Sequence, residues 1–569
     1  MNMKKAILLF LSLFWLIQWS VAQTPKWVEK AKRAVFSVVT YDKNDQLLNT
    51  GNGFFVSEDG IALSDYSLFK GAQRAVIINS EGEQMDVENI MGADDMYDVV
   101  KFRVNITSKK VPFLPLASVA PAVGAQVYLL PYSTQKDRMC AEGKVKAADK
   151  MEKDYLYYTL DMRLKDKMIS CPLTTAEGAV FGLAQKSSGQ DTATICYAVD
   201  ARYAMAQAIS ALSYSNTALS DIGIKKALPD TEEQALVFLY IVSSELSPEK
   251  YAQVLDDYVA QYPQSAEGYL RRATNRLAQT QDEAAMQLVE ADLDQALEVA
   301  ANKADVRFNR AKTIYNYLLT NPAQPYKDWN IDKALTEIRE AVALQPLPVY
   351  KQMEGDILFF KQDYAAALSA YEEVNRSELA SPATFFSAAQ AKEMLKAPSS
   401  EIVALLDSCV AHCRQPYSDA AAPYLLARAQ ALLNDGQARK AMLDYDAYFK
   451  AVDGNVNDVF YYYREQAALE AHQYQRALDD LNKAIELAPQ NMLYRAELAV
   501  VNIRVGRSEE AVKVLQEALK LDEKYAEGYR LLGQAYIQLK KNAEACAAFA
   551  KAKELGDPNV DALIEKYCK

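Results

Sequence analysis

The sequence has few of the residues that build fibrous or loop-dominated proteins. Its 569 residues include only 20 glycines and 19 prolines. This scarcity excludes collagen-like and linker-dominated architectures. Hydrophobic residues make up 50% of the chain, so most of it can bury enough apolar surface to fold. At about 150 residues per domain, a chain of this length is expected to form several folded units.

Positive charge and histidine are also scarce. The 63 lysines and arginines are outnumbered by 75 aspartates and glutamates, which gives a formal net charge of −12. Nucleic-acid binding requires a basic footprint, so this balance argues against a nucleic-acid partner. The two histidines, His412 and His472, both lie far from the N-terminus. Any histidine-dependent chemistry in the first part of the chain is therefore excluded.

Long hydrophobic runs are absent after the first residues of the chain. Residues 6–19 are apolar apart from Ser12 and Gln18, follow the basic residues 1–5, and precede the small residues Ser20 and Ala22. This pattern is typical of a secretory signal peptide over residues 1–22. We therefore expect an exported protein, periplasmic or extracellular, that has no transmembrane helix after cleavage. An uncleaved N-terminal anchor is the alternative.

The seven cysteines are odd in number and irregularly spaced, so no disulfide framework can be assigned. Each half of the chain could pair its own set. Cys409, His412 and Cys413 share one face of a helix and could offer three ligands to zinc, but a fourth ligand is missing. Buried cysteines that pack a helix pair are the favoured interpretation. No metal or cofactor is expected.

Short β-like runs separated by turns fill the chain out to about residue 208. They are residues 34–41, 53–56, 75–78, 99–104, 125–130, 155–160, 180–184 and 194–199. Such spacing predicts an antiparallel barrel or sandwich. Residues 209–230 are rich in serine and irregular, and we interpret them as a linker.

From residue 231 onward the apolar residues recur at helical spacing, and three columns repeat every 34 residues. The columns are Ala477, Ala511 and Ala545; Leu481, Leu515 and Phe549; and Ala484, Ala518 and Ala552. This period resembles the tetratricopeptide repeat. The resemblance covers residues 231–569 and implies about eight helix pairs stacked into a superhelix, with residues 558–568 as a capping helix.

The resemblance to tetratricopeptide repeats also implies a concave groove that binds a protein or peptide. The groove is lined by first-helix residues, and the period places these in the last three repeats at Tyr462, Gln466, Ala496, Val500, Arg504, Arg530 and Gln534. We expect Arg504 and Arg530 to meet acidic groups of the partner. A purely structural spacer is the alternative.

Four segments of residues 23–208 resemble, in order and spacing, the trypsin-fold serine proteases of the Deg or high-temperature-requirement type. The segments are N-G-F-F-V-S-E-D-G at 52–60, L-S-D-Y-S at 63–67, D-V-V-K-F at 98–102, and P-L at 172–173 followed by E-G-A-V-F-G at 177–182. The resemblance implies an all-β double barrel. The whole chain is then a multidomain protein in which this double barrel precedes an all-α superhelix.

The catalytic positions implied by this resemblance are not conventional. The histidine position is Ser67, the nucleophile position is Ile169, and only Asp98 keeps its identity. A serine protease needs an imidazole base and an oxyanion hole. We therefore predict an inactive protease domain. Ser170 or Cys171 activated by Lys165 or Lys167 is the alternative chemistry.

These observations favour an exported protein-binding scaffold. Two other functions remain as alternatives: an envelope serine peptidase with an unconventional base, and a chaperone-like holder of unfolded clients. The sequence does not specify the partner or the oligomeric state.

Overall fold

The computed structural model describes residues 24–568 apart from 108–109, 136–138, 186–194 and 324–325. The expected signal peptide, residues 1–22, lies outside the described residues. The chain divides into two compact units, residues 1–299 and residues 300–569. Among the described residues, no helix has both the length and the apolar character that a bilayer span requires.

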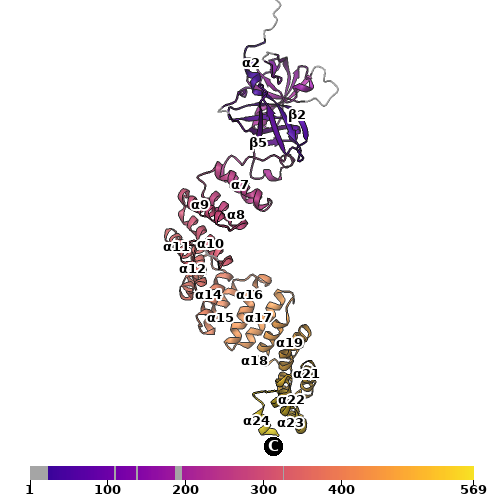
Figure 1. Ribbon diagram of the computed structural model, residues 1–569, viewed down its shortest axis with the longest axis vertical. Coiled ribbons are helices and arrows are strands. Elements are labelled where there is room, and N and C mark those ends of the chain that lie inside the picture. Colours follow the sequence, from indigo (N-terminus) through magenta and orange to yellow (C-terminus); the bar gives the residue numbers. More distant parts are fainter. Residues whose placement is uncertain (1–23, 108–109, 136–138, 186–194, 324–325, 569) are drawn as a thin grey trace, which may run out of the picture. The chain divides into compact units, whose positions relative to one another are not determined.

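The first unit begins with a closed six-stranded barrel in the order β1-β2-β3-β6-β5-β4, in which every pairing is antiparallel (Figure 1). Its strands are β1 (Val35–Tyr41), β2 (Leu47–Phe55), β3 (Ile61–Ser64), β4 (Arg74–Ile78), β5 (Gln84–Asp94) and β6 (Val99–Val104). The short helix α3 (Tyr66–Phe69) follows β3. Phe36, Phe55, Phe69 and Phe102 are buried and pack ring to ring inside this barrel.

A second closed barrel follows in the order β10-β11-β12-β9-β8-β7. Its strands are β7 (Gln126–Leu129), β8 (Ala141–Lys150), β9 (Leu156–Asp161), β10 (Pro172–Thr174), β11 (Val180–Gln185) and β12 (Ile195–Asp200). The 3-10 turn η2 (Asp166–Met168) joins β9 to β10. The two barrels confirm the expected all-β double barrel.

The eight β-like runs of the sequence correspond to strands, but four further strands were missed. Strands β3 and β10 are only four and three residues long. Strands β5 and β8 are longer but contain many polar residues. Buried and exposed side chains are interspersed along β5, and β8 is largely exposed. Polar strands of this kind lack the apolar enrichment that marks a strand in sequence.

Residues 209–230 are not a free linker, which corrects the sequence-based interpretation. Ile209, Leu219, Ile222 and Ile224 are buried and join the core of the first barrel. The Gly223 N–H also donates to a carbonyl of this barrel at 2.7 Å. These buried apolar residues are irregularly spaced among serines, so no helical or strand periodicity marks them in the sequence.

The rest of the chain is helical. The first unit contains α6 (Glu232–Val242), α7 (Pro248–Gln261), α8 (Ala266–Gln279) and α9 (Glu283–Val299). The second contains α10 (Lys303–Thr320), α11 (Ile331–Leu344), α12 (Pro348–Phe360), α13 (Tyr364–Asn375), α14 (Pro382–Met394), α15 (Ser399–Ala411), α16 (Ala422–Asn434), α17 (Ala438–Ala451), α18 (Asp458–Glu470), α19 (Tyr474–Leu487), α20 (Met492–Arg504), α21 (Ser508–Leu521), α22 (Ala526–Gln538), α23 (Asn542–Glu554) and α24 (Asp561–Tyr567).

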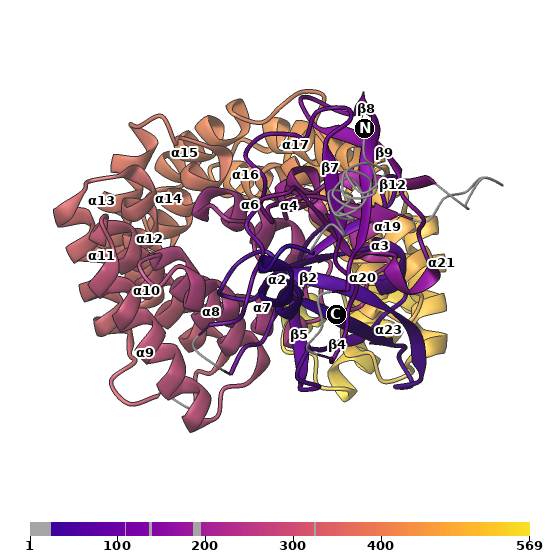
Figure 2. The same ribbon diagram turned by 90° about the horizontal axis from the view of Figure 1, so that it is seen from above.

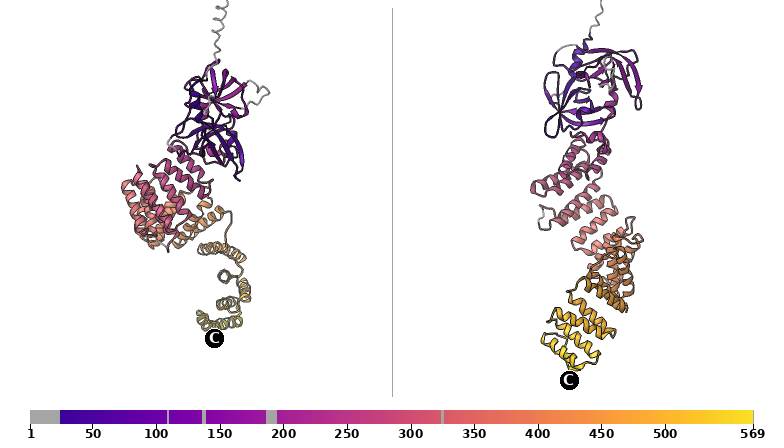
Figure 3. Two further views of the ribbon diagram at one scale, coloured as in Figure 1. Left: turned by 45° about the horizontal axis from the view of Figure 1, so that its top comes forward. Right: turned by 90° about the vertical axis from the view of Figure 1, so that its right-hand side faces the viewer.

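Within the second unit, successive helices pack as antiparallel pairs stacked one after another (Figures 2 and 3). The predicted columns form the core of these pairs, because Ala477, Leu481 and Ala484 are all fully buried. Close approach requires a small residue: a Cβ on Gly533 would collide with the Phe549 ring. The predicted capping segment contains α24, which a Cys546–Cys568 disulfide ties to α23. The predicted helical superstructure of stacked pairs is confirmed.

Candidate functional site

The first candidate site lies where α3 follows β3 and where β6 begins. The Ser67 backbone N–H donates to Asp98 Oδ1 at 2.6 Å, and Ser67 Oγ donates to Asp98 Oδ2 at 3.1 Å. Ser67 is exposed, and Asp98 is half-buried with a left-handed φ of 50°. The structure therefore brings together two of the three predicted triad positions, with a serine hydroxyl on the carboxylate.

The third predicted position, Ile169, lies at the end of η2. The Met168 N–H donates to the Lys165 carbonyl at 2.8 Å, and the Ile169 N–H points to the Asp166 carbonyl at 3.5 Å. The Ile169 carbonyl accepts from Asn52 Nδ2 at 2.8 Å. The backbone N–H groups of Met168 and Ile169 are thus directed to carbonyls at the η2 turn itself.

Ser170 and Asp65 form a buried polar pair beside these positions. Ser170 has a φ of 62° and is 1% exposed, and its Oγ donates to Asp65 Oδ2 at 2.7 Å. Burial raises the pKa of Asp65 well above its usual range; the Asp98 charge adds to this, and the Ser170 hydrogen bond opposes it. The sequence analysis did not single out Asp65, which is the third residue of the L-S-D-Y-S segment.

The alternative nucleophile Cys171 is buried among the core residues of the second barrel. Burial raises the pKa of its thiol to about 12. The candidate bases Lys165 and Lys167 are both exposed. A buried thiol with a raised pKa remains protonated at neutral pH, and a protonated thiol is a poor nucleophile.

The second candidate site is the predicted groove on the last repeats. Gln466 of α18 and Arg504 of α20 line one cavity of about 510 Å³ together with Leu469, Glu470 and His472. The Arg504 guanidinium lies 5.8 Å from the centroid of the Tyr474 ring. Two of the predicted groove residues, which lie on the first helices of neighbouring repeats, therefore line the same cavity.

The other predicted groove residues differ in how exposed their side chains are. Tyr462 packs against Tyr494 of α20 with ring centroids 5.5 Å apart. Val500 is 38% exposed, whereas Ala496 is 4% exposed and packs in the core. The groove residues Gln466 and Gln534 are half-buried. Ala496 therefore contributes packing rather than contact surface.

Arg530 is already engaged within the chain. Its Nη2 lies 2.6 Å from Glu527 Oε1, and its Nε lies 3.1 Å from Asp557 Oδ2. The Asp557 side chain is only 4% exposed. A guanidinium that neutralises a buried carboxylate is a structural group, and little of its charge is left for a partner.

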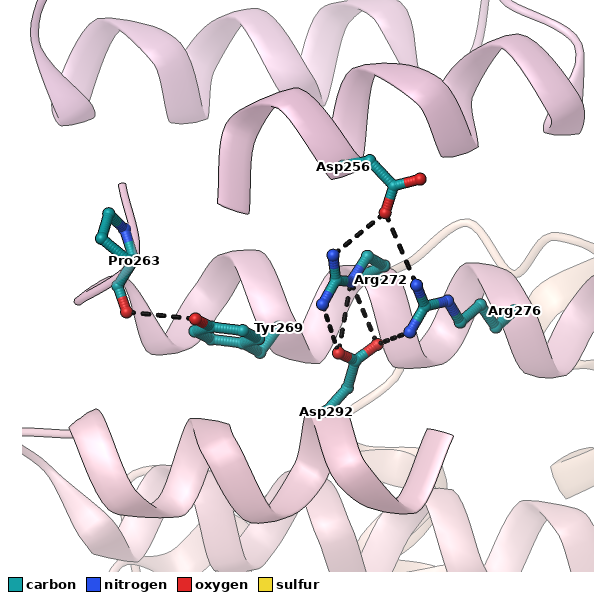
Figure 4. A network of polar contacts seen from close by, with 6 residues as sticks. All are labelled: Asp256, Pro263, Tyr269, Arg272, Arg276 and Asp292. Atoms are coloured by element: carbon teal, nitrogen blue, oxygen red, sulfur yellow. Dashed lines mark hydrogen bonds and ion pairs between the residues drawn. The ribbon is translucent and has the colours of Figure 1, made fainter. Parts of the chain in front are cut away.

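Sequence reasoning missed a recurring arginine bridge between helices. Arg272 of α8 lies between Asp256 of α7 and Asp292 of α9, at 3.0 and 2.7 Å, while Arg276 reaches the same two carboxylates (Figure 4). In the second unit, the same arrangement recurs at Arg428 with Asp407 and Asp444, and at Arg464 with Asp446 and Asp480. Each arginine thereby joins its own repeat to the preceding helix.

The possible zinc ligands on α15 do not converge. Cys409 is buried and its Sγ donates to the Pro382 carbonyl, whereas His412 stacks on Phe385 with ring centroids 4.9 Å apart. Within the described ranges, no group of three or more histidine, cysteine or acidic side chains is arranged to hold a metal ion.

Comparison with protein families agrees with this geometry. The family described as "Trypsin-like peptidase domain" matches residues 51–184. "TPR repeat" matches residues 504–540, and "Tetratricopeptide repeat" matches residues 526–555. The chain joins a trypsin-like peptidase domain to tetratricopeptide repeats. The trypsin-like domain contains Ser67 and Asp98, and the matched repeats contain Arg504, Arg530 and Gln534.

Similar proteins share only short stretches with this chain. DnaJ homolog subfamily C member 7 from Homo sapiens is 30% identical over 92 residues, 16% of this chain and 19% of that protein. Small glutamine-rich tetratricopeptide repeat-containing protein 2 from Mycosarcoma maydis is 31% identical over 96 residues, 17% of this chain and 27% of that protein. TPR repeat-containing thioredoxin TTL4 from Arabidopsis thaliana is 39% identical over 66 residues, 12% of this chain and 10% of that protein. The chain thus spans less than a third of the length of each.

Proposed function

We propose that this protein is an exported protein-binding scaffold whose trypsin-like domain is catalytically inactive. One observation carries the proposal: Ser67 donates to both carboxylate oxygens of Asp98, and the chain has no histidine before His412. A serine hydroxyl cannot accept a nucleophile's proton at neutral pH as an imidazole does. The tetratricopeptide repeats then provide the binding surface.

Two further features support inactivity. The backbone N–H of Ile169, which at the nucleophile position would be one of the two donors to a developing oxyanion, is directed to the Asp166 carbonyl of the η2 turn. The remaining hydroxyl near the site, Ser170 Oγ, is buried and donates to Asp65. Burial raises the pKa of Asp65, and this carboxyl lies beside a serine hydroxyl without the imidazole that a serine protease uses as its base.

Export is part of the proposal. Residues 1–22 have the three-part composition of a secretory signal, and the Cys546–Cys568 disulfide is of a kind that persists in oxidising compartments. We propose a bacterial periplasmic or extracellular location, with Gln23 as the mature N-terminus. Intact-mass analysis of the exported protein tests this, and retention of residues 1–22 would contradict it.

The functional proposal is tested with the chain that begins at Gln23. We expect no cleavage of unfolded casein and no labelling by a serine-directed fluorophosphonate, alongside specific capture of a partner protein from an envelope extract. Casein turnover that disappears in Ser170→Ala or Cys171→Ala, with folding intact, would instead establish an unconventional peptidase. Suppression of client aggregation without a specific partner would indicate a chaperone-like holder.

A further inference from the structure

Glu465 of α18 occupies a position that should hold a small residue. It lies 34 residues before Ala499, which in turn lies 34 residues before Gly533. Both of those positions are small because the first and second helices approach closely there, and Gly533 has no room for a Cβ. The Glu465 side chain is 1% exposed, and neither of its carboxylate oxygens has a hydrogen-bond partner in the described part of the chain. An unpaired buried carboxyl is costly and requires an explanation.

The groups around Glu465 add negative charge. Burial, and then the charges of Glu497 of α20 and Asp480 of α19, raise the pKa of Glu465 to about 8. Arg464 already donates two hydrogen bonds to the Asp480 carboxylate, from Nη2 at 2.6 Å and from Nε at 2.9 Å. Burial, and then the Glu527 charge, raise the pKa of Glu497. Among the described residues, no lysine or arginine forms an ion pair with either Glu465 or Glu497.

An aromatic side chain completes the surroundings on α18. Tyr462 and Glu465 lie three residues apart on α18 and therefore share a face of that helix. Tyr494 and Glu497 have the same spacing on α20. The Tyr462 ring is half-buried and rests on Tyr494. An aromatic face beside unpaired carboxylates matches the chemistry of a basic side chain, whose stem packs on the ring while its head donates to the oxygens.

We propose that Glu465, Glu497 and Tyr462 recognise a lysine or arginine side chain of a partner protein docked on α18 and α20. This inference rests on the proposed scaffold function and names the chemistry of its partner. It replaces the acidic partner expected from Arg504 and Arg530, because Arg530 is already paired with Glu527 and Asp557. The incoming cation supplies the donors that the Glu465 oxygens lack.

The inference is tested by titrating the chain from Gln23 with an acetylated nonapeptide of alternating alanine and lysine. The matched peptide carries glutamate in place of lysine. We expect only the lysine peptide to bind, and we expect Glu465→Gln and Glu497→Gln each to weaken its binding at least tenfold. The control is Glu517→Gln, which changes an exposed glutamate of α21 and should leave binding unchanged.

A second readout separates recognition from a purely structural role. Binding of a cation should ionise Glu465, so titrations at pH 7 in buffers of different ionisation enthalpy should show proton release that Glu465→Gln abolishes. Absence of lysine-peptide binding, equal binding of both peptides, or full affinity in both glutamine variants at unchanged melting temperature would overturn the inference. Those outcomes leave the scaffold proposal intact, because that proposal depends on partner capture and on the absence of proteolysis.

Discussion

The trypsin-like domain and the repeats pair their buried carboxyls with different groups. In the barrels, serines pair with the carboxyls at and beside the predicted triad positions: Ser67 with Asp98, and Ser170 with Oδ2 of Asp65. In the repeats, arginines pair with most buried carboxylates, yet Glu465 has no partner among the described residues. Asp65 leaves one carboxyl oxygen unpaired, whereas Glu465 leaves both, so Glu465 is the buried carboxyl that a partner can complete most fully.

This contrast suggests that the two regions contribute differently to function. The cores of the two barrels do not include Ser67, Asp98 or Ile169, so the packing of the barrels does not depend on the residues at the predicted triad positions. The repeats depend on small residues at helix crossings, so a large acidic residue at such a crossing is retained at a cost in stability. Natural proteins accept that kind of cost at functional sites.

The largest expected effect tests the arginine bridges. Arg464→Ala removes the bidentate partner of Asp480, whose side chain is only 5% exposed. Leaving a buried carboxylate unpaired costs about 3–5 kcal/mol. We expect a marked drop in the urea midpoint of the repeats. The matched control is Arg439→Ala, at an exposed arginine of α17, and equal stability of the two variants would contradict the structural role of the bridge.

The next effect concerns Glu465, whose pKa is raised by folding from 4.5 to about 8. The folded state therefore holds this proton more tightly than the unfolded state, and stability falls as the pH rises from about 4.5 to 8. Glu465→Ala should remove this loss and stabilise the chain by up to about 5 kcal/mol at pH 8.5, with little change at pH 4.5. Urea unfolding at the two pH values measures the difference between wild type and variant, and parallel pH profiles would refute the assignment.

The sequence predicted the architecture better than it predicted the sites. The apolar strands and the 34-residue columns could be predicted because burial imposes a regular pattern of apolar residues on the sequence. The polar strands β5 and β8 show little of this apolar pattern. Short motifs predicted the triad positions, and the structure places two of them, Ser67 and Asp98, in hydrogen-bond contact. Glu465 was missed because a glutamate on an amphipathic helix is typical of an exposed face; only its alignment with Ala499 and Gly533 revealed that it is buried.

A smaller effect is expected inside the trypsin-like domain. Ser170→Ala removes the hydrogen bond to Asp65 and should cost about 1 kcal/mol, with no change in any measured activity. Ser170→Gly loses the same bond, but glycine tolerates the φ of 62° without strain, so this variant should be less destabilised than the alanine variant. Thermal melts of both variants test this order. A loss of biological activity in either variant that remained folded would show that Ser170 acts chemically.

The smallest effect tests the sign of the partner's charge. Arg504 is exposed, lines the groove cavity with Gln466 and Glu470, and places its guanidinium over the Tyr474 ring. Arg504→Glu should therefore change stability by less than about 0.5 kcal/mol. If the groove takes a basic side chain, the added negative charge should strengthen capture of the lysine peptide by about twofold to fivefold, since a partly screened charge contributes at most about 1 kcal/mol. An acidic partner predicts the reverse, a loss of about tenfold, so the direction of this single change decides between the two interpretations of the repeat surface.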